Sequence, residues 1–313
     1  MRKFIYKTLL FTLPVLLLFL AIELFIVFKP NSFNTKAKYI QNNLDVEAVF
    51  LGSSHTQNGI NPEFMSLKTV NLAYGGQDYT LDSTLFFHYA SKLPNLKYVF
   101  LEMDYHSLEH TNLANYFRNP WYYKYHDISG LNLTSIEKYS LYLSNPTFFK
   151  NYLTLNFDPK EYKYEINQYG FVTNDFPGVF KDFNHDSIQI QATAASRLRK
   201  RHKQNSIENY QLNKRRLLSI IDYCLEHDIK VILFRNPVYP SYRNQYIHEK
   251  NERRLHLLDS LISTNKIEVM DFENSKDFKV TDFKNDDHLN SSGAKKLTLM
   301  TNEKLMNIIK QNQ

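Results

Sequence analysis

The chain has 313 residues, of which 43% are hydrophobic and 22% are charged, so its composition is that of a folded globular protein and not of a disordered one. A single cysteine excludes a disulfide framework and a cysteine-based zinc site, and only eight glycines with no repeating period argue against collagen-like, propeller and solenoid proteins. The formal charge of +6 is not concentrated in one tract, so it gives no strong indication of nucleic-acid binding.

Residues 1–30 have the pattern of a membrane anchor. A short basic tail precedes Thr8–Phe28, a run of 21 residues whose only charge is Glu23. A helix of this length rises roughly 31 Å, about the hydrocarbon thickness of a bilayer. A secretory signal peptide is the competing interpretation, but its apolar region is shorter and ends in a small-x-small cleavage pattern that is missing here. We therefore expect an uncleaved transmembrane helix.

The charges on either side of this span are nearly balanced, so they do not fix its orientation. A short basic tail before a single span favours a cytoplasmic N-terminus and a large domain outside the cytoplasmic membrane. Near the end of the span, Glu23 is expected to be tolerated, either snorkelling toward water or facing a partner helix.

Residues 31–313 alternate between short β-rich runs and amphipathic helical segments. The expected strands are 46–51, 70–74, 98–101, 230–234 and 267–271, and the expected helices are 78–93, 207–227, 244–264 and 291–310. Asp78 is expected to cap the first of these helices, and Ser291 or Ser292 the last. This alternation predicts βαβ units, a five-stranded parallel sheet and a ligand site at the carboxyl ends of the strands.

Residues 106–205 break the alternation between the third and fourth expected strands. The segment is rich in Tyr, Phe and Asn and contains several turn signals, such as Asn119-Pro120 and Asn145-Pro146. We expect an insertion that forms a cap over the active face.

Two motifs at the expected carboxyl edge carry the residue types of nucleophilic catalysis. Gly52-Ser53-Ser54 directly follows the first strand and presents Ser54 as a nucleophile. A serine needs a general base, and His288 lies in the loop after the fifth strand, at the same edge. Asp286 is expected to orient the imidazole, with Asp287 as the rival.

A third motif, Asn71-Leu-Ala-Tyr-Gly-Gly76, follows the second strand. Glycines at this place allow a backbone N–H, here that of Gly76, to approach a developing oxyanion. The N–H of Ser54 is the second expected donor.

Together these motifs resemble the SGNH (GDSL-like) hydrolase superfamily. Gly52-Ser53-Ser54 matches the first family block with Ser in place of Asp, and Asn71 to Gly76 matches the second block except at Ala73. His288 matches the histidine of the last block, where Asp286 gives the Asp-x-His spacing of the alginate O-acetyltransferase branch. The third block, expected after the third strand, is missing.

The resemblance implies a fold and a role. The fold is the flavodoxin-like, three-layer, doubly wound five-stranded sheet of that superfamily. The anchor, the Gly-Ser-Ser block and the missing third block are similar to the DltD-like and alginate-acetylation members, which work outside the cytoplasmic membrane beside a membrane-bound O-acyltransferase. The resemblance therefore implies a Ser-His-Asp esterase or O-acyltransferase that acts on O-acyl, typically acetyl, groups of a cell-surface polysaccharide.

Three further residues are candidates for substrate contact. Asp104 and His106 follow the third strand and open onto the same face, and Arg235 follows the fourth. Arg235 is suited either to an anionic substrate group or to a structural ion pair. His106 and His110 also form an H-x-x-E-H pattern, which in one class of zinc hydrolase lies on a helix; here it directly follows a strand, so an ordinary cleft-lining loop is favoured.

No cofactor motif is present in the sequence, and we expect neither a cofactor nor a metal. The alternative to an enzyme is a membrane-tethered scaffold with the same fold and no turnover, serving a membrane-bound O-acyltransferase. The missing third block favours the scaffold, whereas retention of Ser54, Gly76, Asp286 and His288 together favours the enzyme.

Overall fold

The computed structural model describes residues 1–112, 116–158, 163–174, 179–182, 184, 186–198, 202–263 and 267–311. Its centre is a five-stranded, fully parallel sheet with the strand order β2-β1-β3-β4-β5, which confirms the predicted α/β class and its flavodoxin-like order. The strands are β1 (Ala48–Leu51), β2 (Thr69–Asn71), β3 (Tyr98–Glu102), β4 (Lys230–Arg235) and β5 (Ile267–Asp271).

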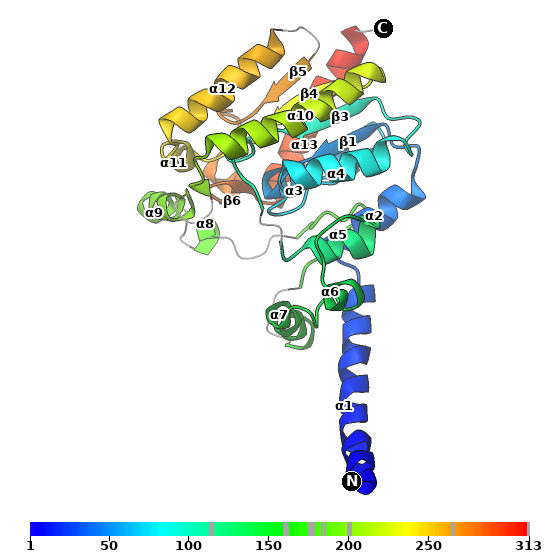
Figure 1. Cartoon of the computed structure of the whole chain (residues 1–313). Helices are drawn as coiled ribbons and strands as arrows, with labels where there is room; N and C mark the ends of the chain where they lie inside the picture. The colour runs from blue at the N-terminus through cyan, green and yellow to red at the C-terminus, as the bar shows by residue number, and fades with distance from the viewer. Residues whose placement is uncertain are drawn as a thin grey trace.

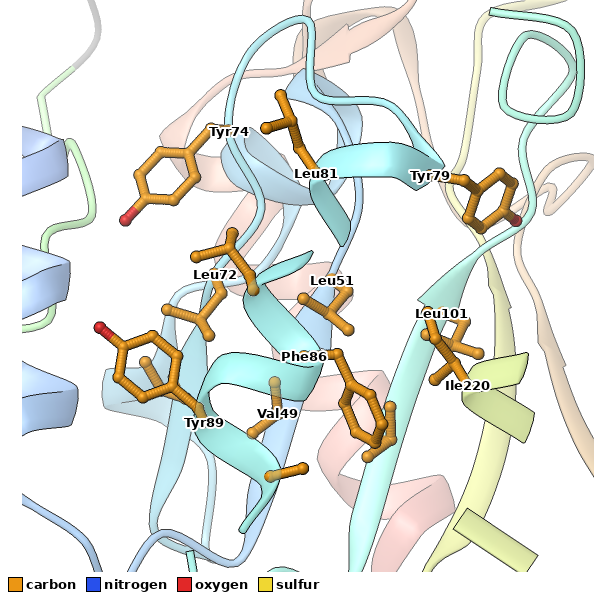
Figure 2. Close-up of a cluster of buried hydrophobic side chains, with 14 of the residues drawn as sticks. Val49, Leu51, Leu72, Tyr74, Tyr79, Leu81, Phe86, Tyr89, Leu101 and Ile220 are labelled. Atoms are coloured by element: carbon orange, nitrogen blue, oxygen red, sulfur yellow. The ribbon is translucent and has the colours of Figure 1, made fainter. Parts of the chain in front are cut away.

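Helices cover both faces of the sheet (Figure 1). One layer contains α4 (Tyr79–Ala90), α10 (Ile207–Glu226) and α12 (His248–Ile262), and the other contains α13 (Ser291–Gln311). Successive residues of a strand point to opposite faces, so Val49 and Leu51 pack under α4 whereas Phe50 packs on the α13 side. Figure 2 shows the first of these cores, in which Phe86 and Tyr89 of α4 lie over the sheet.

Three of the five expected strands match to within one residue, whereas the first begins two residues later, at Ala48, and the second is Thr69–Asn71 in place of 70–74. The expected helix 244–264 begins four residues later, at His248. Asp78 caps α4 as predicted, because its Oδ1 accepts the N–H groups of residues 80 and 81. The first turn of α13 is capped by Asn290, whose side chain accepts the N–H of Gly293, and not by Ser291 or Ser292. Ser54, expected in a loop, begins the short helix α3 (Ser54–Gly59).

Two small strands that the sequence did not indicate carry the last motif. They are β6 (Phe283–Asn285) and β7 (His288–Leu289), which pair in the antiparallel direction. The tight turn between them contains residues 286 and 287.

The insertion between β3 and β4 contains short helices, and parts of it lie outside the described residues. They are α5 (Asn119–His126), α6 (Ser135–Tyr139), α7 (Pro146–Phe157), α8 (Val179–Asp182) and α9 (Ser187–Arg197). In Figure 1, α5, α6 and α7 lie at the end of the domain where α1 joins it, whereas α8 and α9 lie near β6 and α11 (Pro240–Arg243).

The N-terminal helix α1 (Arg2–Phe28) projects away from the domain and leads into α2 (Ser32–Asn42) (Figure 1). It is long and apolar enough to cross a membrane, as the sequence predicted.

Candidate active site

Ser54 is presented by a tight turn between β1 and α3. Gly52 has a φ of +144°, and a methyl group added there would lie 2.5 Å from the Cβ of Glu102, so only glycine fits. Glu102, at the end of β3, accepts the N–H of Ser53 at 2.9 Å and the hydroxyl of Thr56 at 2.8 Å. This buried carboxylate fixes the first turn of α3, and with it the Ser54 side chain.

Ser54 and His288 meet at the carboxyl edge of the sheet. The Oγ of Ser54 lies 2.7 Å from the Nε2 of His288, although 234 residues separate the two in the chain. The contact joins the start of α3 to β7, and α3 packs directly against β7. The sequence analysis expected these two side chains to meet here as nucleophile and base.

The carboxylate on the other side of His288 belongs to Asp287, the rival, and not to Asp286. Asp287 Oδ1 lies 2.7 Å from His288 Nδ1, and the Asn285 Oδ1 lies 3.0 Å from the same nitrogen. Asp286 is buried, and its backbone carbonyl accepts the N–H of Tyr239. The turn between β6 and β7 therefore directs the second aspartate, and not the first, toward the imidazole.

A second histidine, which we did not anticipate, lies behind this carboxylate. His55 is 3% exposed, with its Nδ1 2.7 Å from Asp104 Oδ2 and its Nε2 3.4 Å from Asp287 Oδ2. Burial alone lowers the pKa of His55, but hydrogen bonds and charges from the two carboxylates outweigh it and raise the pKa well above its usual range. Its position next to Ser54 in the sequence was the one available signal.

Asp104 and His106 lie behind the nucleophile, where both are buried. Asp104 accepts the N–H of Asn236 at 2.8 Å as well as its bond from His55. His106 Nε2 lies 3.0 Å from the Ser53 hydroxyl, and burial together with neighbouring histidines lowers its pKa. Both residues therefore contact the neighbours of Ser54, His55 and Ser53, and do not face a substrate as the sequence predicted.

The H-x-x-E-H segment forms turns and not a helix, and its glutamate, Glu109, pairs with Arg253. Donor atoms of His55, His106 and His202 lie within 4.8 Å of one another, which makes these three residues a candidate metal-binding group. The rings of His106 and His202, however, are stacked with an interplanar angle of 10°. Lone pairs in two parallel planes cannot converge on one ion, so this arrangement does not fit a metal.

The glycine motif approaches Ser54 through Gly75. A methyl group added at Gly75 would lie 3.7 Å from the Ser54 Cβ and 3.0 Å from Arg118 Nη1. The same group at Gly76 would instead meet the Tyr116 hydroxyl. Arg118, from the insertion, also donates to the carbonyl of Gly75, which places a cation beside the nucleophile that the sequence did not reveal.

Asn71 and Arg235 have structural contacts. The Asn71 amide donates to the carbonyls of Thr56 and Ile60 and thereby holds the end of α3. Arg235 is buried and pairs with Asp271 and Glu273, which is the ion-pair alternative that the sequence left open.

A pocket with a cavity volume of about 60 Å³ lies beside β6 and β7, and neither Ser54 nor His288 is among its lining residues. Its wall includes Asn58, whose amide donates to the Ser54 carbonyl, and Leu289, which follows His288. The rest of the lining is Phe171, Val172, Asn174, Lys181, Phe283, Lys284, Asn290 and Ser291, so the insertion contributes one side.

Comparison with known proteins gives little further information. No protein-family model matches the chain, and no curated protein matches it. Among solved structures, a protein from Bacteroides fragilis NCTC 9343 described as a "putative acylhydrolase" matches 86% of this chain and 96% of its own, with 14% identity and a TM-score of 0.39. A likeness at this level carries no argument for activity, so the functional case rests on the geometry of the site.

Proposed function

We propose that the protein is a membrane-anchored serine esterase or O-acyltransferase in which Ser54 is the nucleophile, His288 the general base and Asp287 the orienting carboxylate. The observation that carries this proposal is the unbroken series of two 2.7 Å contacts from Ser54 Oγ through the His288 ring to Asp287 Oδ1. When a carboxylate orients an imidazole that can take the proton of a serine hydroxyl, the hydroxyl is activated for attack on an ester.

In the first step, His288 Nε2 takes the proton of Ser54 as Oγ attacks the carbonyl carbon of the acyl ester. The tetrahedral intermediate collapses, its ester C–O bond breaks, and the leaving alcohol receives the proton from His288. In the second step, a water or a sugar hydroxyl loses its proton to His288 and attacks the acyl-enzyme. Ser54 regains its proton when the acyl group leaves.

His55 completes the acid–base arrangement as a positioning residue. With both ring nitrogens hydrogen-bonded to carboxylates, it holds Asp287 through Oδ2 and leaves Oδ1 for His288. Its raised pKa favours the protonated form, whose charge offsets part of the repulsion between Asp104 and Asp287.

The oxyanion is best placed between the N–H of Ser54, at the start of α3, and the N–H of Gly75. This modifies the expected pair of donors by one residue, because a methyl group added at Gly75, and not one added at Gly76, would lie next to the Ser54 side chain, 3.7 Å from its Cβ. Arg118 lies against Gly75 and supplies a positive charge to the same space.

We infer that the substrate is an O-acyl, typically acetyl, group on a cell-surface polysaccharide outside the cytoplasmic membrane. The resemblance of the motifs and the apolar helix α1 support this assignment. A membrane-bound O-acyltransferase is the proposed partner that exchanges acyl groups with Ser54.

The test is release or transfer of acetate from acetylated polysaccharide by the full-length protein in detergent. Ser54→Ala and His288→Ala are expected to lose at least about a thousandfold in rate, because each removes an essential member of the catalytic unit. The control for loss of folding is the unfolding temperature of each variant, which should equal that of the wild type. Wild-type acylation in cells that carry Ser54→Ala would overturn the enzymatic proposal in favour of the scaffold.

A further inference from the structure

The exposure of α1 changes abruptly along its length. From Arg2 to Ala21 every side chain is exposed except the half-buried Thr12. The domain begins to cover the helix at Ile22, and Glu23, Ile26 and Val27 are buried against it. The uncovered length of 20 residues rises about 30 Å, which equals the hydrocarbon thickness of a bilayer. No spacer therefore separates the apolar span from the domain.

Glu23 marks the place where the covering begins. Its carboxylate, on a side chain that is 3% exposed, accepts three consecutive backbone N–H groups, those of Leu141 at 2.6 Å, Tyr142 at 2.9 Å and Leu143 at 2.8 Å. Charge-assisted bonds of this kind are among the stronger ones in proteins. The loop between α6 and α7 is thus attached to α1 at the level where the uncovered span ends.

Aromatic side chains of α7 also contact α1, one turn before Glu23 and just after it. The ring centroid of Phe149 in α7 lies 5.9 Å from that of Phe19, which is one turn deeper in the span than Glu23. The ring centroids of Phe157 and Phe25 lie 6.2 Å apart. In Figure 1, α7 is seen nearly end-on beside α1, which runs lengthwise. The helix therefore lies across the anchor, as a helix in the plane of a membrane surface does.

The segment from α6 to α7, residues 135–157, also exposes large apolar side chains beside this contact. Ile136 is 67% exposed, Tyr139 90% and Phe157 64%. Lys138 and Lys150 are exposed on the same segment. Apolar and aromatic side chains interleaved with lysines are typical of segments that rest in the headgroup region of a bilayer.

We propose that the 135–157 segment rests in the outer interface of the bilayer that α1 crosses, so that the domain sits directly on the membrane at a height fixed by the Glu23 contact. The inference rests on the membrane anchoring in the proposed function. A lipid surface is the occupant that these observations favour, because the exposed apolar groups adjoin the span itself.

The experiment measures how deeply labelled positions lie in vesicles. The full-length protein is reconstituted into phosphatidylcholine vesicles whose acyl chains are brominated at either a shallow or a deep position, and a bimane label is placed on single introduced cysteines. The native Cys224 does not compete for the label, because it is buried and burial raises the pKa of its thiol to about 12. The labelled variants are Tyr139→Cys, Phe157→Cys, Val15→Cys within the span, and Ile262→Cys.

The last variant is the matched control, since Ile262 is an exposed apolar residue at the C-terminal end of α12, at the opposite end of the domain from α1 (Figure 1). We expect shallow bromines to quench the labels at 139 and 157, deep bromines to quench the label at 15, and neither to quench the label at 262. Quenching at 15 without quenching at 139 and 157 would overturn the inference and leave the anchor intact, and a protein partner would then be the occupant of this surface. Absence of quenching at 15 would contradict the anchor itself.

Discussion

Replacement of Asp287 by Asn tests which carboxylate serves His288. Asp287 Oδ1 lies 2.7 Å from His288 Nδ1, and the Asp287 side chain is fully buried. At an effective dielectric constant of about 20, a carboxylate at this distance stabilises an imidazolium by about 6 kcal/mol, or roughly 10⁴-fold in rate. An amide that turns its NH₂ group toward Nδ1 also forces the proton onto Nε2, which then cannot accept the Ser54 proton.

The assay is the hydrolysis of 4-nitrophenyl acetate by the full-length protein, with kcat and KM measured separately. Asp287→Asn is expected to lower kcat by about 10⁴-fold with little change in KM, since the interaction strengthens only as His288 gains its proton. Asp286→Asn, one residue earlier in the same turn, is the matched control and is expected to stay within about tenfold of the wild type. The reasoning is refuted if Asp286→Asn loses about 10⁴-fold while Asp287→Asn remains active.

Three further predictions concern the anchor, the core and the site. Glu23→Ala leaves three backbone N–H groups unsatisfied, each at about 1–3 kcal/mol, so limited proteolysis should cut the insertion much faster than in Leu24→Ala; equal rates would contradict this. Burial lowers the pKa of His126 to about 3. The free energy of unfolding should therefore decrease by about 1.4 kcal/mol for each unit by which the pH is lowered between about 6.5 and 3. In that pH range only the unfolded chain binds the proton. Denaturant titrations at several pH values should therefore show that the unfolding free energy of His126→Gln depends less steeply on pH than that of the wild type. An equally steep dependence would refute the assignment. Gly75→Ala places a methyl group 3.0 Å from Arg118 Nη1, so it should displace the Arg118 guanidinium and lower esterase activity, and full activity would show that the Arg118 charge beside Gly75 is not needed.

The sheet and the pairing of Ser54 with His288 were predictable because both depend on local pattern plus topology. Short β-rich runs alternate with amphipathic helices, and a parallel sheet brings the loops after its strands to one edge. Motifs at the two ends of the chain therefore meet, whatever the details of the loops.

The choice between Asp286 and Asp287 was not predictable, because it depends on the backbone of a two-residue turn between strands that are themselves only three and two residues long. His55 was missed for a different reason. Its partners, Asp104 and Asp287, lie 49 and 232 residues away, so its role depends entirely on tertiary contacts.

Glu23 shows the same limit at the anchor. In the sequence it is a single charge in an apolar run, and such a charge is ordinarily tolerated near the end of a span. Its acceptance of backbone N–H groups cannot be read from sequence, because every residue except proline carries such a group.

The most direct measurement for the central claim is covalent labelling of the nucleophile. The full-length protein is treated with a fluorophosphonate probe, and the adduct is located by peptide mass spectrometry in the wild type, Ser54→Ala and His288→Ala. We predict an adduct on Ser54 in the wild type that is lost in both variants, because the 2.7 Å contact with His288 is what activates the hydroxyl. An unlabelled Ser54 in folded wild-type protein, or labelling that persists in His288→Ala, would contradict the account.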